Sequence, residues 1–184
     1  MIKKSCDISA CGRYRWTLDL EISEESKQII FIGLNPSLSS EEFTDNTTKK
    51  IINISKKYSY GKVKIINLFG LISTSPKSLF SDNNPIGDFN NHVINESLKY
   101  WSNEKNCNLW IGWGNYGTYL GRNKFFFNKL KPYLQYKINI FKKTLGPLCI
   151  KKTKKLNPIH PLYCSNNSIL TEYDLYDCKS YDSQ

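Results

Sequence analysis

The sequence lacks the features that mark membrane proteins, secreted proteins and cysteine-bound metal sites. No apolar stretch approaches the roughly 18 residues of a membrane span or the roughly 10 of a secretory signal. Six cysteines are present, but none forms a CxxC pair, so neither an iron–sulfur cluster nor a zinc site is expected. We therefore predict a cytoplasmic protein with reduced thiols, no metal and no cofactor.

Three common enzyme motifs are also missing. The chain has no GxxxxGK[ST] phosphate loop and no GxGxxG fingerprint, which disfavours ordinary nucleotide enzymes. The GWGNYG segment has closely spaced glycines, but without the dinucleotide-binding spacing. A GxSxG elbow is absent, and Ser37 follows a proline, so a Ser-His-Asp hydrolase is a poor fit.

Acidic residues are few beside the basic ones. The chain has 16 Asp and Glu against 26 Lys and Arg, a formal net charge of +10, with much of the excess in short lysine clusters. This balance favours a polyanionic partner such as DNA. A chain rich in Asn, Ile and Lys can also reflect the nucleotide bias of a genome, so charge alone leaves a nucleic-acid role open.

The length and the apolar content indicate one domain. At 184 residues with 40% hydrophobic side chains, the chain is large enough to bury a single continuous core. We expect a single domain over residues 1–184, with residues 1–12 and 178–184 loosely ordered. We also expect a monomer with no membrane association.

The hydrophobic pattern alternates between strand and helix signals. Residues 13–21 alternate in polarity and predict a half-exposed edge strand, whereas apolar runs predict further strands at 28–34, 63–71, 107–114 and 135–141. Helical spacing predicts helices at 49–58, 88–101, 122–134 and 167–176. This order predicts an α/β protein with three α/β/α layers and a central, mainly parallel four-stranded sheet plus an N-terminal edge strand.

In such sheets the ligand binds beyond the carboxyl ends of the strands. Asn35 and Asn67 leave two of the predicted strands, and a later loop holds His160, one of only two histidines, close to prolines on both sides. An asparagine can read the edge of a planar heterocycle or hold a water, and a restrained histidine suits a catalytic donor. Each residue alone also has an ordinary reading, as a turn asparagine or a surface histidine.

Taken in order, the segments RYRWTL, GLNPSLSS, DNTTKK, INLFGL, WGNYG and HPLY resemble a bacterial family of small proteins known only as a domain of unknown function. The resemblance covers residues 13–170. The same segments are similar in order and kind to the motifs of the uracil-DNA glycosylase superfamily. In its mismatch-specific branch the first motif reads Gly-Ile-Asn-Pro-Gly, close to GLNPS here, and the family's Leu-Leu-Asn and His-Pro-Ser-Pro-Leu-Ser segments resemble IIN and HPLY.

The glycosylase resemblance implies a uracil-DNA glycosylase-like fold and a role for each matching residue. It implies that Asn35 positions the attacking water, that Asn67 reads a flipped base, and that His160 donates a hydrogen bond to the departing base. The further candidates for contacting the base are Phe69, Pro36, Ser37 and Tyr163. The candidates for contacting the rest of the nucleic acid are Lys151, Lys152, Lys154, Lys155, Asn115 and Arg122.

The sequence also departs from the glycosylase pattern. Asn35 stands where the fastest family members have a carboxylate, and an amide cannot act as a general base. Asp45 is the candidate substitute, and the histidine loop is shorter than in the family. We expect a DNA glycosylase that hydrolytically removes a damaged or modified base, in repair or in phage defence. A non-catalytic nucleic-acid or nucleobase sensor and a hydrolase of free nucleosides or nucleotides are the open alternatives.

Overall fold

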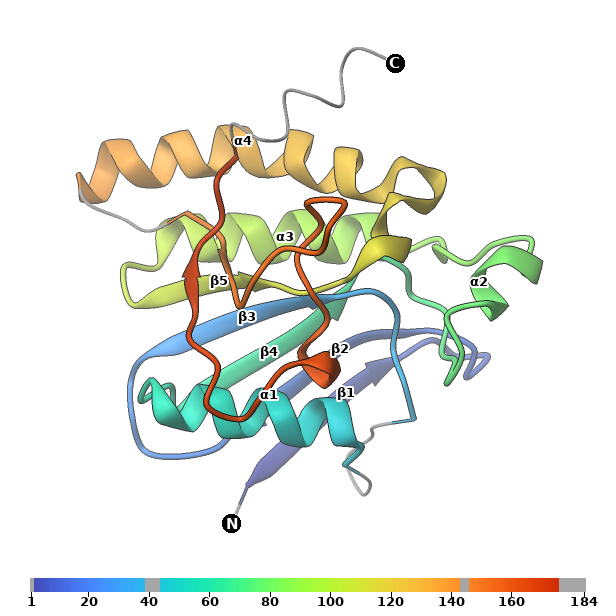
Figure 1. The fold of residues 1–184 in the computed structure, drawn as a ribbon, viewed down its shortest axis with the longest axis horizontal. Coiled ribbons are helices and arrows are strands. Elements are labelled where there is room, and N and C mark those ends of the chain that lie inside the picture. The colour runs from blue at the N-terminus through green and yellow to red at the C-terminus, as the bar shows by residue number, and fades with distance from the viewer. Residues whose placement is uncertain (1, 39–43, 143–145, 176–184) are drawn as a thin grey trace.

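The computed structural model describes residues 2–38, 44–142 and 146–175 (Figure 1). Its centre is a mixed seven-stranded sheet with the order β1-β2-β4-β3-β5-β6-β7. Strands β4, β3, β5 and β6 run parallel, whereas the pairs β1–β2, β2–β4 and β6–β7 are antiparallel. The strand bounds are β1 Lys3–Ile8, β2 Arg15–Glu21, β3 Gln28–Gly33, β4 Lys62–Asn67, β5 Cys107–Ile111, β6 Leu148–Cys149 and β7 Thr171–Glu172.

Helices cover both faces of the sheet (Figure 1). The helix bounds are α1 Asn46–Lys57, α2 Ser78–Ser81, α3 Asn90–Asn103, η1 Asn115–Gly121, α4 Arg122–Phe141 and η2 Pro161–Tyr163. Ile51 of α1 packs with Ile65 and Phe31 in one apolar core, and Trp101 of α3 and Phe126 of α4 belong to the other. The α/β class predicted from the sequence is therefore confirmed.

Helix α1 begins where the sequence supplies a cap. The Asp45 carboxylate accepts a hydrogen bond from the backbone N–H of Thr48 at 2.7 Å, which satisfies one of the free donors at the helix start. Ile51, Ile52 and Ile54 then bury one side of the helix against the sheet. The helix predicted at 49–58 is thus present and starts three residues earlier.

The prediction of a strand at 135–141 was wrong, because α4 continues through Pro132 to Phe141. Within this last part the ammonium group of the buried Lys137 donates to the carbonyl oxygens of Trp101 at 2.6 Å and Cys107 at 3.2 Å. Those bonds tie the end of α4 to the end of α3 and the start of β5. The place beside β5 is taken instead by the two-residue strand β6.

The ends of the chain also differ from expectation. Residues 1–12 were expected to be loosely ordered, but β1 pairs with β2 over Lys3–Ile8, so β2 is not an edge strand. The closing helix predicted at 167–176 is absent from its described part, which contains β7. Residues 178–184 lie outside the described part of the chain. Within the ranges given above, no helix is both long enough and apolar enough to cross a bilayer.

Candidate functional site

A cavity of about 610 Å³ opens beyond the carboxyl ends of β3, β4 and β5. Its walls come from the turns that follow these strands, from the first turns of α1, and from residues 153–163, whose 3₁₀ helix η2 lies against α1 (Figure 1). Asn35, Asn67 and His160, which are far apart in the sequence, all line this cavity. The other predicted site residues that line it are Ser37, Asn115, Lys155 and Tyr163.

Asn67 ends β4 at the floor of the cavity and is only 4% exposed. It pairs in register with Gly33 of β3, and a Cβ atom at Gly33 would lie 2.5 Å from the Asn67 Oδ1. Glycine is therefore what lets the amide sit against the neighbouring strand. The Asn67 Nδ2 is buried and has no hydrogen-bond partner among the residues that the structure describes. A buried donor in this state costs free energy that a ligand's acceptor would recover.

Asn35 fixes the turn that follows β3. Its Nδ2 donates to the carbonyl oxygens of Ser73 at 2.9 Å and Pro36 at 3.0 Å, so the donor is used to hold two loop segments together. Among the described residues, no hydrogen bond reaches the Oδ1 of the same amide. This oxygen can accept a hydrogen bond from a water, but it cannot take up a proton at neutral pH.

His160 presents a neutral imidazole to the cavity. The backbone N–H of Leu162 donates to the His160 Nδ1 at 3.3 Å, which places the ring proton on Nε2. Burial lowers the pKa of His160 to about 4, and the negative charge of Asp45 opposes this shift only in part. At pH 7 the ring is therefore an uncharged donor through Nε2–H. Pro161, which follows directly, starts η2 and fixes the backbone at this point.

Asp45 and Pro36, two predicted site residues, do not line the cavity. One carboxylate oxygen of Asp45 accepts from the N–H of Thr48, and the other accepts from the hydroxyl of Ser37. Asp45 thus joins the loop after β3 to the start of α1. Pro36 is buried, and its carbonyl oxygen accepts from the backbone N–H of Ser73 at 2.9 Å.

Phe69, predicted to contact a base, is a core residue instead. It is 0% exposed, and its ring packs 5.9 Å from that of Tyr119, away from the cavity lining. The aromatic side chains that do line the cavity are Phe31, Trp113, Tyr116 and Tyr163. The Phe31 ring lies where a side chain at position 112 would need space, since a Cβ at Gly112 would be 2.8 Å from it. No motif in the sequence marks Phe31 as a cavity residue.

Arg122, predicted to contact nucleic acid, is buried outside the cavity as well. Its Nε donates to the carbonyl oxygen of Leu68 and one terminal nitrogen donates to the Oδ1 of Asn91, both at 2.8 Å. Burial lowers its pKa to about 10. Arg122 therefore joins the start of α4 to the end of β4, a structural role that its position after a glycine turn did not reveal.

The predicted lysines divide between the cavity and the surface. Lys155 lines the cavity, whereas Lys151 and Lys154 are exposed outside it. The Nζ of Lys152 lies 4.9 Å from the centre of the Tyr173 ring. Asn115 lines the cavity, and its Oδ1 accepts a hydrogen bond from the Thr153 hydroxyl at 2.7 Å.

A family described as "Protein of unknown function (DUF1643)" matches residues 15–162, which include every strand and helix that contributes to the cavity floor. The chain belongs to this family. No curated protein and no solved structure matches the chain. Strand β1 and the last strand, β7, lie outside the residues that the DUF1643 family matches.

Arg15 is a residue of the DUF1643 cavity for which the sequence suggested no role. It is 3% exposed, lines the cavity, and donates weakly to the carbonyl oxygen of Ser37 at 3.4 Å. Burial lowers its pKa, while the nearby Cys6 and Asp45 favour its charged form. Arg15 and Lys155 give the lining two cationic side chains, and none of the described residues that line it is acidic.

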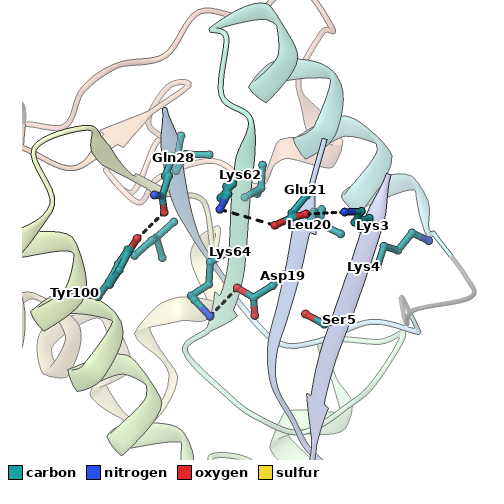
Figure 2. Close-up of a pocket in the computed structure, with 13 residues that line it drawn as sticks. Lys3, Lys4, Ser5, Asp19, Leu20, Glu21, Gln28, Lys62, Lys64 and Tyr100 are labelled. Atoms are coloured by element: carbon teal, nitrogen blue, oxygen red, sulfur yellow. Dashed lines mark hydrogen bonds and ion pairs between the residues drawn. The ribbon is translucent and has the colours of Figure 1, made fainter. Parts of the chain in front are cut away.

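A second hollow of this DUF1643 protein, of about 440 Å³, lies over β1, β2, β4 and β3, and we call it the groove (Figure 2). Gln28 and Lys62, the first residues of β3 and β4, line it, so it sits at the opposite ends of the parallel strands from the cavity. Most of its charged side chains pair across the strands, most closely Lys64 with Asp19 at 2.7 Å. In the described parts of the chain, no group of three or more His, Cys, Asp and Glu is arranged to hold a metal.

Proposed function

We propose that the cavity receives a nucleobase turned out of a DNA strand and that the protein hydrolyses the N-glycosidic bond of this nucleotide. One observation carries the proposal. Asn35, Asn67 and His160 come from three separate segments and line the same cavity, and each keeps a polar atom to which no other described side chain bonds. The similarity of the GLNPS, IIN and HPLY motifs to those of the uracil-DNA glycosylase superfamily supports the same reading.

His160 supplies the main chemical effect in this proposal. Cleavage of an N-glycosidic bond develops positive charge on the sugar and negative charge on the departing base. A neutral Nε2–H donor fixed beside a base oxygen binds the developing anion more strongly than the neutral substrate, so it lowers the barrier. Because the pKa of His160 is about 4, the ring donates a hydrogen bond at pH 7 without being a cation.

Asn67 and Asn35 serve binding and hydration in the proposal. The buried Nδ2 of Asn67 donates to an acceptor on the base edge and gains a partner that the protein does not give it. The free Oδ1 of Asn35 orients a water toward the sugar. An amide cannot remove the proton of that water, so we expect slow turnover.

The activity is tested by incubating the protein with oligonucleotides that each carry one uracil, hypoxanthine or modified cytosine, followed by hot alkali. We expect strand cleavage at one of these bases. His160→Ala should lower the single-turnover rate about 10²- to 10³-fold, as loss of one transition-state donor does in other enzymes. His92→Ala is the matched control, because His92, the other histidine, is exposed on α3 and should leave the rate unchanged.

The absence of abasic product with all of these oligonucleotides, and with phage DNA rich in modified bases, would refute the activity. The product must also depend on His160, since equal rates in the wild type and the His160→Ala variant would point to a contaminating enzyme.

A second candidate function is a sensor that binds the base without cleaving it. It is favoured by one observation, namely that no acidic side chain lines the cavity among the described residues and both carboxylate oxygens of Asp45 are engaged elsewhere. A sensor would bind an oligonucleotide with the preferred base equally well as wild type and as Asn35→Ala, with no turnover in either form. A cleavage rate that falls in Asn35→Ala with unchanged affinity would exclude the sensor.

A further inference from the structure

Three aromatic side chains form a connected surface next to the cavity, and we call them the aromatic ridge: Phe80, Tyr116 and Tyr119. Phe80 comes from the short helix α2 and the two tyrosines from η1. The Phe80 ring packs edge-on against Tyr116, with centroids 5.5 Å apart, and against Tyr119, with centroids 4.6 Å apart. Phe80 is nevertheless 46% exposed and Tyr116 is 44% exposed.

The aromatic ridge is continuous with the cavity and anchored in the core. Tyr116 itself lines the cavity. At the other end, the Tyr119 ring lies 5.9 Å from the fully buried Phe69. The rings are therefore held in place by packing, so little side-chain entropy remains to be lost when a flat ligand stacks on them.

Leu120, which follows Tyr119 of the ridge, is another exposed apolar residue. Leu120 has φ 50° and ψ 25°, a left-handed conformation that is uncommon for a leucine, and the side chain is exposed. Gly121 follows with φ 65°, so the turn before α4 is made of two left-handed residues. Unusual backbone of this kind tends to persist at ligand-binding surfaces.

The charge around the ridge fits an anionic partner. Arg15 and Lys155 line the adjoining cavity, and Lys77 is exposed next to α2. The chain as a whole carries a formal net charge of +10. An apolar protein partner would need only the aromatic surface. A nucleic-acid strand can stack its bases on the rings and pair its phosphates with the cations.

We propose that the aromatic ridge stacks against the bases that flank the one in the cavity, so that the preferred partner is single-stranded DNA. This inference rests on the proposed function, because the ridge is placed beside the cavity that would hold the flipped base. Aromatic side chains can stack only on bases whose faces are open. In a duplex those faces are covered by neighbouring base pairs, whereas in a single strand they are available.

The test is a fluorescence-anisotropy titration with a labelled thymidine oligonucleotide that contains no damaged base, compared with a duplex of the same length. We expect tighter binding of the single strand. Phe80→Ala should weaken that binding about 5- to 100-fold, the range for one base–aromatic stack, and Phe80→Trp should restore it. The matched control is Tyr136→Ala, since Tyr136 is equally exposed, at 45%, but lies on α4 away from the ridge.

Two outcomes would overturn the inference: equal affinity for single strand and duplex, or single-strand affinity unchanged in Phe80→Ala. The second outcome would leave the ridge as a surface for a protein partner. Because the probe carries no target base, its binding is independent of cleavage. Loss of single-strand binding in Phe80→Ala together with no base removal from any oligonucleotide would refute the proposed enzyme and retain the single-strand surface.

Discussion

The groove and the cavity are similar in size, but they differ in how their polar groups are paired. In the groove the polar side chains bind one another: Lys64 pairs with Asp19 at 2.7 Å, and the Tyr100 hydroxyl donates to Gln28 at 2.7 Å (Figure 2). In the cavity, the Nδ2 of Asn67 is buried without a partner among the described residues. The His160 ring accepts a hydrogen bond at Nδ1, and no described residue accepts one from its Nε2–H.

The difference in pairing suggests that the cavity, and not the groove, is a ligand-binding site. Side chains that pair with each other in water gain little and leave nothing for a ligand to bind. A buried donor without a partner lowers stability, and a ligand acceptor that reaches it recovers this free energy. The comparison also agrees with position, because ligands of parallel sheets bind at the carboxyl ends of the strands, where the cavity lies.

The largest expected effect concerns the pH dependence of stability. The pKa of His160 falls from 6.5 to about 4 on folding, so the unfolded chain binds the proton first as the pH drops. The contribution of His160 to the free energy of unfolding is complete above pH 6.5 and is lost as the pH falls toward 4. The loss amounts to at most about 3 kcal/mol, because part of the ring still meets water.

Denaturant unfolding of the wild type and His160→Gln at pH 7 and pH 4 measures this loss. The wild type should lose more free energy of unfolding than the variant over that interval, while other titrating groups cancel in the difference. An identical pH dependence of both proteins would mean that His160 is as solvated as in the unfolded chain, and the cavity would then resemble the groove.

The next effect compares two buried asparagines. The Nδ2 of Asn90 donates to the carbonyl oxygens of Leu68 at 2.9 Å and Asn67 at 3.2 Å, whereas the side chain of Asn67 makes no such bond. Asn90→Ala should therefore lower the free energy of unfolding by about 1–3 kcal/mol more than Asn67→Ala does. For the affinity toward an oligonucleotide with the preferred base, we expect the opposite order, with the larger loss in Asn67→Ala.

Thermal or denaturant unfolding gives the first half of this comparison, and an anisotropy titration gives the second. If Asn67→Ala costs as much stability as Asn90→Ala, the Asn67 amide serves the fold and its missing partner carries no functional meaning.

Much of the fold could be predicted because local signals and tertiary packing agree. The capped start of α1 and the apolar runs of β3, β4 and β5 are examples. The segment at 135–141 could not be predicted, since its alternating pattern is typical of a strand. It stays helical with Lys137 bonded to carbonyl groups of the preceding helix and strand. Strand β1 was missed because its side chains are mostly exposed, so no apolar pattern marks it.

The candidate site was partly predictable for a geometric reason. The rule that ligands bind at carboxyl ends of parallel strands leads to Asn35 and Asn67, and both line the cavity. The rule does not say which way a side chain turns. Phe69 comes two residues after Asn67, which ends β4, yet its side chain is buried in the core. Arg122 is also buried, and its Nε donates a hydrogen bond to the carbonyl oxygen of Leu68.

The smallest expected effect lies in the groove. The side chains of Lys64 and Asp19 are about one-third exposed, so Lys64→Met should change the free energy of unfolding by less than about 1 kcal/mol, and less still at high salt. The same variant should bind single-stranded DNA as the wild type does. A loss of about tenfold in that affinity would place the phosphate backbone in the groove. A surface of paired side chains would then bind DNA too. The pairing of polar side chains could no longer distinguish the groove from the cavity.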